Sequence, residues 1–212
     1  MNIVTLPIGV YVSNCSLVWE DPAKIWIIDP GSEAERILAE IKRNRLTGCS
    51  QIILTHGHFD HISSVNEILE AFPGVPVHLH PADLKMAFSP LNSVPFCYPQ
   101  TRKPETLVTD LTDGALLSAD GMSMEVIHTP GHTPGSCCLY FREEKVLFSG
   151  DTLFQGSIGR TDFPGGSMSE MSRSLNRLKE LPDDLKVIPG HGGVTTIGAE
   201  KRENPYLTYP DF

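Results

Sequence analysis

Metal-ligating residue types gather in one short segment, Thr55-His56-Gly57-His58-Phe59-Asp60-His61, which follows a short apolar run. At the end of a strand, side chains two residues apart point to the same side, so His56 and His58 are placed to bind one metal ion together. Asp60 and His61 fall where a helix is expected to begin, so their side chains can turn toward a second, neighbouring point. Imidazole and carboxylate groups together suit divalent metals such as zinc, iron and manganese.

Three later loops add further ligands, and each places one histidine or aspartate beside glycine just after a strand-like run. These loops contain Gly131-His132, Gly150-Asp151 and Gly190-His191, and their glycines allow the backbone to approach an ion closely. Together with the first segment they supply seven candidate ligands, enough for two divalent metal ions. The seven are His56, His58, Asp60, His61, His132, Asp151 and His191.

Strand-like and helix-like runs alternate along the chain and would carry these loops. The expected strands are Val10–Trp19, Ile25–Ile28, Gln51–Leu54, Val75–Leu79, Ala115–Leu117, Ser123–His128, Cys137–Phe141, Lys145–Phe148 and Lys186–Ile188. The expected helices are one capped by Ser32 with Ile37, Leu38 and Ile41 on its apolar face, one carrying Val65, Ile68, Leu69 and Phe72, a short one after Pro81, and one near Met168–Leu181. Strands interrupted by helices in both halves predict an α/β sandwich with the sheets inside and the helices outside.

Residues 89–104 contain four prolines, which argue against regular structure there. A loop of this length in a compact domain is often a functional lid. The alternative is a packed surface loop with Phe96 and Tyr98 as its anchors, and the sequence leaves both interpretations open.

Length and composition limit the class of protein. The chain has 212 residues, a size that predicts one domain over 1–212, and its formal net charge of −9 argues against a nucleic-acid partner. No apolar run approaches the ~20 residues of a membrane span. Five cysteines without the spacing of a disulfide framework predict a reduced, cytoplasmic protein. The oligomeric state is left open.

The order of these motifs resembles that of the metallo-β-lactamase superfamily, from Asp29-Pro30-Gly31 to the last histidine loop. The resemblance implies a four-layer αββα sandwich with the metals at one edge. It also implies the ligand sets. His56, His58 and His132 would hold the first metal, Asp60, His61 and His191 the second, and Asp151 would bridge both.

Within the superfamily, the chain is most similar to short, single-domain glyoxalase II-like proteins. The matching segments are Gly150-Asp151-Thr152-Leu153-Phe154, Gly159-Arg160-Thr161-Asp162-Phe163-Pro164 and Asn204-Pro205. Two departures concern glutathione binding. The chain is too short for the C-terminal helical region of the larger glyoxalase II enzymes, and Arg160 and Asp162 stand where those enzymes have lysine and tyrosine. Arg160 can still pair with a carboxylate, so it is the candidate substrate-binding residue.

The implied chemistry is hydrolysis of a small anionic thioester. The thioester can be one linked to glutathione, such as S-lactoylglutathione. A water between two divalent ions, with zinc favoured and iron or manganese as alternatives, would be hydroxide near neutral pH. Asp60 and Asp151 are the candidate catalytic residues. Other interpretations are a mononuclear-iron persulfide dioxygenase, whose ligands would be His56, His132 and Asp151, a hydrolase of another small ester or lactone, and a non-enzymatic metal-binding module.

Three further residues have more than one interpretation. Asp29, at a strand end, is expected either to accept a hydrogen bond from a ligand imidazole or to serve only its turn. His78 and His80 share one face of a strand and mimic a two-histidine metal site, but they are expected to be ordinary strand residues outside the metal centre.

Overall fold

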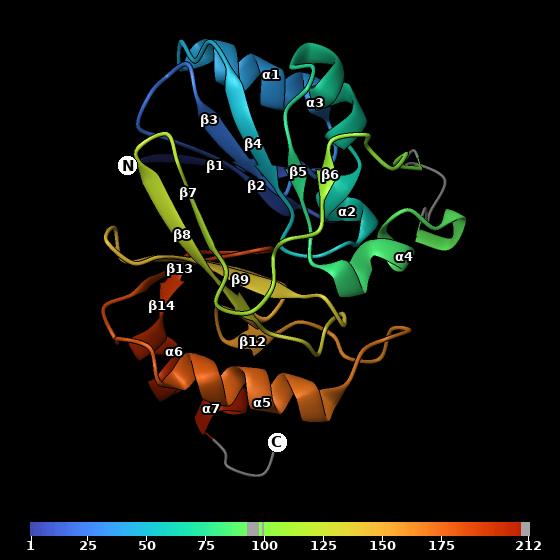
Figure 1. Cartoon of the computed structure of the whole chain (residues 1–212). Coiled ribbons are helices and arrows are strands. Elements are labelled where there is room, and N and C mark those ends of the chain that lie inside the picture. Colours follow the sequence, from blue (N-terminus) through green and yellow to red (C-terminus); the bar gives the residue numbers. More distant parts are fainter. Residues whose placement is uncertain (93–97, 99, 209–212) are drawn as a thin grey trace.

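Two six-stranded β-sheets form the centre of the molecule (Figure 1), and the computed structural model describes residues 1–92, 98 and 100–208. The first sheet has the order β1-β2-β3-β4-β5-β6. Its strands are β1 (Asn2–Ile8), β2 (Ser13–Trp19), β3 (Ile25–Ile28), β4 (Cys49–Ile53), β5 (Val77–His78) and β6 (Leu107–Val108). The second sheet has the order β14-β13-β10-β9-β8-β7. Its strands are β7 (Leu116–Ala119), β8 (Met122–His128), β9 (Cys137–Phe141), β10 (Val146–Gly150), β13 (Lys186–Pro189) and β14 (Thr195–Thr196). The hairpin of β11 (Leu153–Phe154) and β12 (Ser157–Ile158) is separate.

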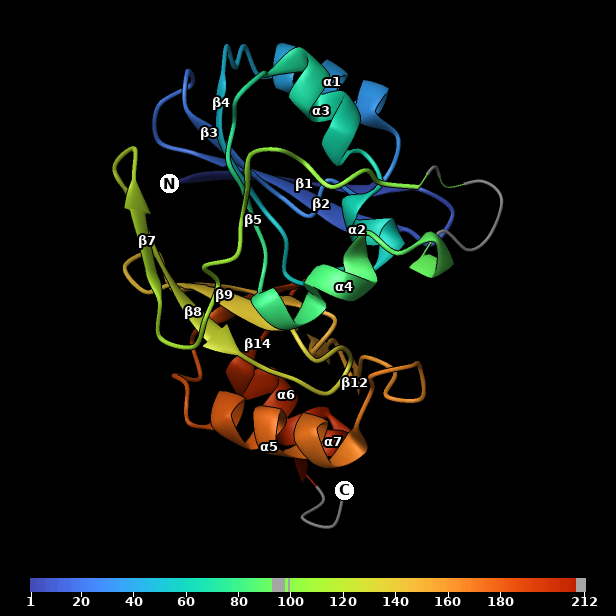
Figure 2. The ribbon, with the colours of Figure 1, turned by 45° about the vertical axis from the view of Figure 1, so that its right-hand side comes forward.

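Helices lie outside both sheets (Figures 1 and 2). On the side of the first sheet they are α1 (Ala34–Arg43), α2 (Phe59–Ile62), α3 (Val65–Ala71), α4 (Leu84–Ala87) and the 3-10 turns η1 (Pro81–Asp83) and η2 (Pro90–Asn92). On the side of the second sheet they are α5 (Met168–Lys179), α6 (Ile197–Glu203) and α7 (Pro205–Thr208). The predicted α/β fold with four αββα layers is therefore confirmed.

Three apolar cores separate the four layers, and alternation along the strands explains how one strand serves two cores. In β2, Leu17 packs toward α1 and α3, whereas the next residue, Val18, packs between the sheets. In β9, Phe141 lies between the sheets and Tyr140 faces the core beneath α5. Since successive side chains of a strand point to opposite faces, these strands are apolar on both sides.

Two local expectations were wrong. The strand predicted at Val10–Trp19 begins only at Ser13, because the chain reverses between β1 and β2 through Gly9 and Val12, both at positive φ. Helix α1 begins after Glu33 with no side-chain cap, so Ser32 is not its N-cap. Strand β1 was not predicted, and its Pro7 is tolerated because β1 is an edge strand of the first sheet.

The strands that carry the candidate ligands end at the same edge of the sandwich. In the first sheet β3 runs parallel to β4, and in the second sheet β10 runs parallel to β13. The loops that follow the two strands of each pair therefore lie at the same edge of the sheet. Backbone hydrogen bonds join the two sheets at this edge. The Cys137 amide donates to the Thr55 carbonyl at 2.8 Å, and the Asn14 amide donates to the Gly190 carbonyl at 2.7 Å.

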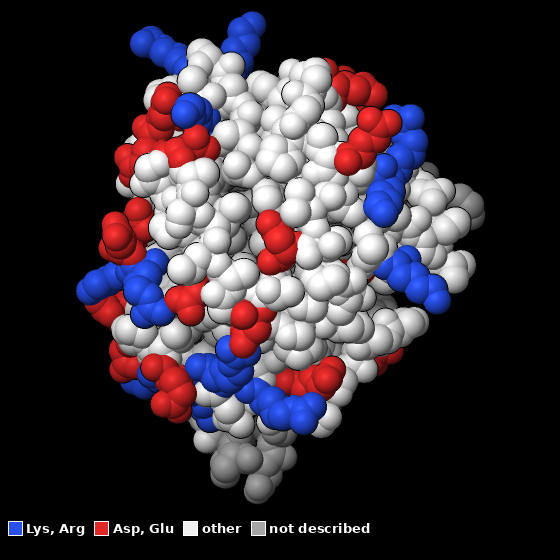
Figure 3. Space-filling view, in the orientation of Figure 1, with Lys and Arg blue, Asp and Glu red and all other residues white. Residues whose placement is uncertain are grey.

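The predictions that exclude nucleic-acid and membrane partners stay predictions. On the face shown in Figure 3, acidic and basic side chains are interspersed around a broad uncharged area. Among the described residues, none of the helices combines the length and the apolar character needed to cross a bilayer.

Candidate metal centre

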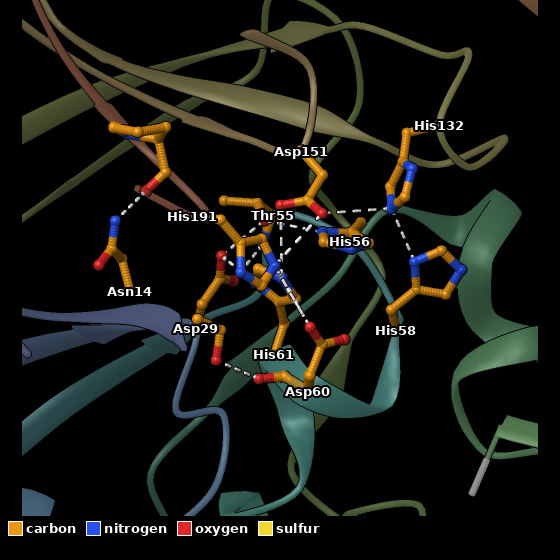
Figure 4. A network of polar contacts seen from close by, with 12 residues as sticks. Asn14, Asp29, Thr55, His56, His58, Asp60, His61, His132, Asp151 and His191 are labelled. Atoms are coloured by element: carbon orange, nitrogen blue, oxygen red, sulfur yellow. Dashed lines mark hydrogen bonds and ion pairs between the residues drawn. The ribbon is translucent and has the colours of Figure 1, made fainter. Parts of the chain in front are cut away.

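All seven predicted ligands come together where the two sheets meet (Figure 4). The loop after β4 and the short helix α2 supply the first four, because His58 is the extended N-cap of α2 and the next two ligands lie in its first turn. The loop after β8 supplies His132, the end of β10 supplies Asp151, and the end of β13 supplies His191.

The first group of donors consists of three histidines. Ligand nitrogens of His56, His58 and His132 lie within 4.8 Å of one another. His58 Nδ1 is 2.8 Å from His132 Nε2. His56 is fully buried, and its Nε2 has no hydrogen-bond partner.

The second group contains one carboxylate and two imidazoles, those of Asp60, His61 and His191. His61 Nε2 is 3.2 Å from His191 Nε2. Asp60 Oδ2 lies 3.3 Å from His191 Nε2 and 3.7 Å from His61 Nε2.

Asp151 lies between the two groups. Its Oδ2 is 3.5 Å from Nε2 of His132 in the first group and 3.5 Å from Nε2 of His191 in the second. Its Oδ1 is 3.4 Å from His61 Nε2 and is buried without a hydrogen bond. The carboxylate thus contacts both donor groups.

The donor set fits bound divalent metal ions. Buried polar atoms are normally hydrogen-bonded, yet His56 Nε2 and Asp151 Oδ1 both lack a partner and both belong to the candidate centre. A cation coordinated at this point would satisfy both atoms. The mixture of imidazole nitrogen and carboxylate oxygen is the ligand chemistry of zinc, iron and manganese.

Electrostatics differ between the two groups. Burial, followed by the neighbouring His132, lowers the pKa of His58 to about 3, and burial also lowers the pKa of His56. These imidazoles are neutral at neutral pH and need lose no proton to bind a metal. Burial opposes the protonation of His61, but the carboxylates of Asp151, Asp60 and Asp29 outweigh it and raise the pKa of His61 to about 10. Three carboxylates thus surround His61 with negative charge, which a bound metal cation would neutralise.

Outer hydrogen bonds orient the ligand imidazoles. His132 Nδ1 lies 2.7 Å from the Arg160 carbonyl, and His191 Nδ1 lies 3.0 Å from the Tyr11 carbonyl. Because a carbonyl oxygen can only accept, each Nδ1 donates, and each Nε2 is left free to bind a metal. The sequence did not reveal these two partners, because every residue type offers a backbone carbonyl.

Asp29 has the orienting contact that the sequence allowed for. Its Oδ2 lies 3.0 Å from His61 Nδ1 and accepts from the Thr55 hydroxyl at 2.7 Å, while its Oδ1 accepts from the Thr55 amide at 2.7 Å. Thr55 Oγ1 is in turn 3.1 Å from His56 Nδ1. One buried carboxylate is therefore linked to a ligand of each group.

Asp29→Asn is expected to weaken metal binding by about 10–100-fold, the usual effect of losing a partner of a ligand histidine. Asn is tolerated at positive φ, and Asp29 has a φ of 49°, so the variant removes the charge while keeping the backbone. A competition titration against a chelator measures the loss. Asp21→Asn, in the exposed β2–β3 turn, is the control, and equal affinities in the two variants would contradict the assignment.

His78 and His80 lie outside the centre, as expected, but only His78 is a strand residue, because β5 ends there and the His80 side chain caps η1 by accepting from the Ala82 amide at 3.1 Å. His78 Nδ1 is 2.9 Å from Asp110, and its Nε2 is 2.7 Å from Gln51 Oε1. The His80 ring stacks on His128 at 4.1 Å between ring centroids.

Arg160 lies beside the first group, but its guanidinium already has partners. It donates two hydrogen bonds to Asp162, at 2.9 and 2.7 Å, and lies 4.2 Å from the centroid of the Phe163 ring. That ring is 5.8 Å from the ring of His58.

The described part of the 89–104 segment contacts the loops next to the centre. The Tyr98 hydroxyl accepts from the Val10 amide at 3.0 Å, and the Tyr98 ring lies 4.9 Å from that of Phe59. Tyr98 is thus an anchor, as the packed-loop interpretation expected. Phe96, the other expected anchor, lies outside the described residues, and the lid role stays a prediction.

The chain belongs to the metallo-β-lactamase superfamily, whose family model matches residues 8–191. It is 40% identical to "Hydroxyacylglutathione hydrolase GloC" of Haemophilus influenzae, with 98% of each chain covered. Among solved structures, it is similar to the BLEG-1 B3 metallo-beta-lactamase, with a TM-score of 0.89 and 38% identity over 98% of this chain and 100% of that one. It is also similar to TTHA1623 in a di-iron-bound form, with a TM-score of 0.84 and 37% identity over 96% of this chain and 100% of that one.

Proposed function

We propose that this protein is a metal-dependent hydrolase that cleaves a small anionic thioester, such as S-lactoylglutathione, at a two-metal centre. The observation that carries the proposal is the position of Asp151, whose Oδ2 is 3.5 Å from a ligand nitrogen of each donor group. One carboxylate at that point can be shared by two ions. Similarity over nearly the whole chain to a protein named a hydroxyacylglutathione hydrolase supports the thioester class.

The proposed ligands are the three histidines of the first group for one ion, the three residues of the second group for the other, and Asp151 for both. Two bound divalent ions, with zinc favoured, would supply Lewis acidity and lower the pKa of water from 15.7 toward about 7. Asp60 and Asp151 offset only part of the charge of two such ions, so the loaded centre attracts an anion within an acidic protein. The Tyr11 and Arg160 carbonyls keep the ligand nitrogens of His191 and His132 pointing inward.

A thioester suits this set of residues because of its leaving group. A thiol has a pKa of about 8.5, so the departing thiolate needs no residue to protonate it. An amide nitrogen would need such a residue.

One paired experiment tests the proposal. Metal content is measured first, and the protein is then assayed with S-lactoylglutathione and, separately, with glutathione persulfide while oxygen is followed. Two metals per chain with thioester cleavage and no oxygen uptake is the expected result. Failure to cleave the thioester would overturn the substrate class and leave another small ester or lactone as the candidate.

A mononuclear-iron persulfide dioxygenase is the second candidate. It is favoured by the stretch from Gly159 to Phe163, which resembles those enzymes. A single iron per chain with oxygen uptake in the same experiment would establish this candidate and overturn the two-metal hydrolase.

We assign Arg160 to the anionic part of the substrate. Arg160→Gln is expected to raise the KM for an anionic thioester roughly fivefold and to leave kcat nearly unchanged, because an exposed charge contributes modestly and equally to substrate and transition state. Steady-state kinetics measure both constants. Arg142→Gln is the matched control, since Arg142 also pairs with a carboxylate, that of Glu125, and lies 4.8 Å over an aromatic ring, but in the β9–β10 turn. An identical KM in both variants would remove Arg160 from substrate binding.

A further inference from the structure

We propose that Asp83 is a positioning residue that fixes the two loops of the first metal site relative to each other. Asp83 is the last residue of η1, and none of its surface is exposed. Its Oδ2 accepts from the Gly57 amide at 2.9 Å and from the Thr133 hydroxyl at 2.7 Å, and its Oδ1 accepts from the Gly135 amide at 2.7 Å. A single buried carboxylate thus binds two loops that come from different sheets.

Both loops carry the proposed ligands of the first group. Gly57 stands between His56 and His58, and Thr133 directly follows His132. The carboxylate therefore accepts hydrogen bonds from Gly57 and Thr133, which are the sequence neighbours of all three histidines. Within the described part of the chain, it makes no hydrogen bond to a metal-binding atom. A shift of either loop would change the 2.8 Å separation between His58 Nδ1 and His132 Nε2.

The packing around Asp83 shows that the loops approach it closely. A Cβ atom placed on Gly135 would lie 2.6 Å from Asp83 Cγ, so only glycine allows this approach. The next peptide group is also held, because Asn92 Nδ2 donates to the Gly57 carbonyl at 2.7 Å. Asp83 and Asn92 thus hold the two peptide groups on either side of Gly57, one at its N–H and the other at its carbonyl.

The hydrogen-bond chemistry requires a carboxylate at this position. The two amides can only donate, and together with the Thr133 hydroxyl they place three donors around two oxygens. Burial raises the pKa of the Asp83 carboxyl, and these three hydrogen bonds oppose the rise. Asparagine has nearly the same shape but would turn an NH₂ group toward a donor, so one loop would lose its partner.

The inference rests on the proposed ligand set and not on the substrate, so metal binding tests it. Cobalt(II) is titrated into the wild type, Asp83→Asn and Asp110→Asn in the presence of a competing chelator, and its d–d absorption is recorded. Asp110 is the control because its carboxylate pairs with His78 and contacts neither loop. In Asp83→Asn, one site should weaken at least about 10-fold with an altered d–d band, and the other should stay within about twofold of the wild type.

Each other result has a distinct meaning. Wild-type affinity at both sites of Asp83→Asn would overturn the inference, and so would equal weakening of both sites, because a general loss of structure affects both. If the wild type itself takes up no cobalt, the proposed ligand set fails and the inference fails with it. Should Asp83→Asn not fold, Thr133→Val removes one donor only. It should weaken the same single site about threefold, and an unchanged affinity there would also overturn the inference.

Discussion

Asp151→Asn is expected to lower kcat by at least about 10³-fold and to leave fewer than two metals bound per chain. Asparagine keeps the size of the side chain but replaces a charged oxygen, which lies between His132 and His191, by a neutral group. Metal ions stabilise developing charge by several kcal/mol, so the loss of the shared ligand is expected to cost about 4 kcal/mol or more, which corresponds to that factor. Turnover of S-lactoylglutathione and metal content measured on the same sample check both parts.

Asp184→Asn is the control for this result. Asp184 is an exposed aspartate whose carboxylate pairs with Lys145, so Asp184→Asn should leave kcat and metal content unchanged. If Asp151→Asn kept two metals and activity within tenfold of the wild type, the shared-ligand role would be wrong. Loss of activity with full metal content would instead indicate a role in the reaction without a role in metal retention.

The clustering of the seven candidate ligands was predictable because their residue types are distinctive and because they follow strands. The segment from His56 to His61 needs only a strand end and a helix start to split into two donor groups, and both are local features. His132, Asp151 and His191 needed one further assumption, that the strands before them end at the same edge. The parallel pairing of β10 with β13 and the hydrogen bond between Cys137 and Thr55 show why they do.

Other parts of the site depend on contacts between residues that are distant in sequence, and residue type alone does not indicate these contacts. Tyr11 contributes its carbonyl to His191, 180 residues away, and any residue at that position could do so. The same segment misled the strand prediction, because Val10 and Val12 favour strands locally while the pairing of β1 with β2 places them in the reversal. Asp83 ends a three-residue 3-10 turn that begins with a proline, and its proposed role depends on two loops that lie 26 and 50 residues away in opposite directions.

Gly190→Ala is also expected to lower kcat strongly, by a steric clash alone, because it leaves every proposed ligand in place. Gly190 precedes His191, and an added Cβ would overlap Asp151 Oδ1 and lie 2.9 Å from His61 Cε1. The backbone cannot withdraw, because its amide donates to the Gly150 carbonyl at 2.8 Å and its carbonyl accepts from the Asn14 amide at 2.7 Å. The two side chains must therefore move. A displacement of about 1 Å at a reacting centre costs about 10²-fold in rate, so kcat should fall by at least that factor.

Gly193→Ala is the matched control for Gly190→Ala. Gly193 lies in the same loop, and its added Cβ would meet only the end of the flexible Gln155 side chain, at 2.7 Å from Oε1. That side chain can turn away, so kcat and cobalt affinity should stay within about twofold of the wild type. Since both variants add one methyl group to one loop, a difference between them reports on contact with Asp151 and His61 and not on loop flexibility. Equal activities in the two variants would mean that the centre tolerates the displacement of both ligands, and a shared, tightly placed Asp151 would then be wrong.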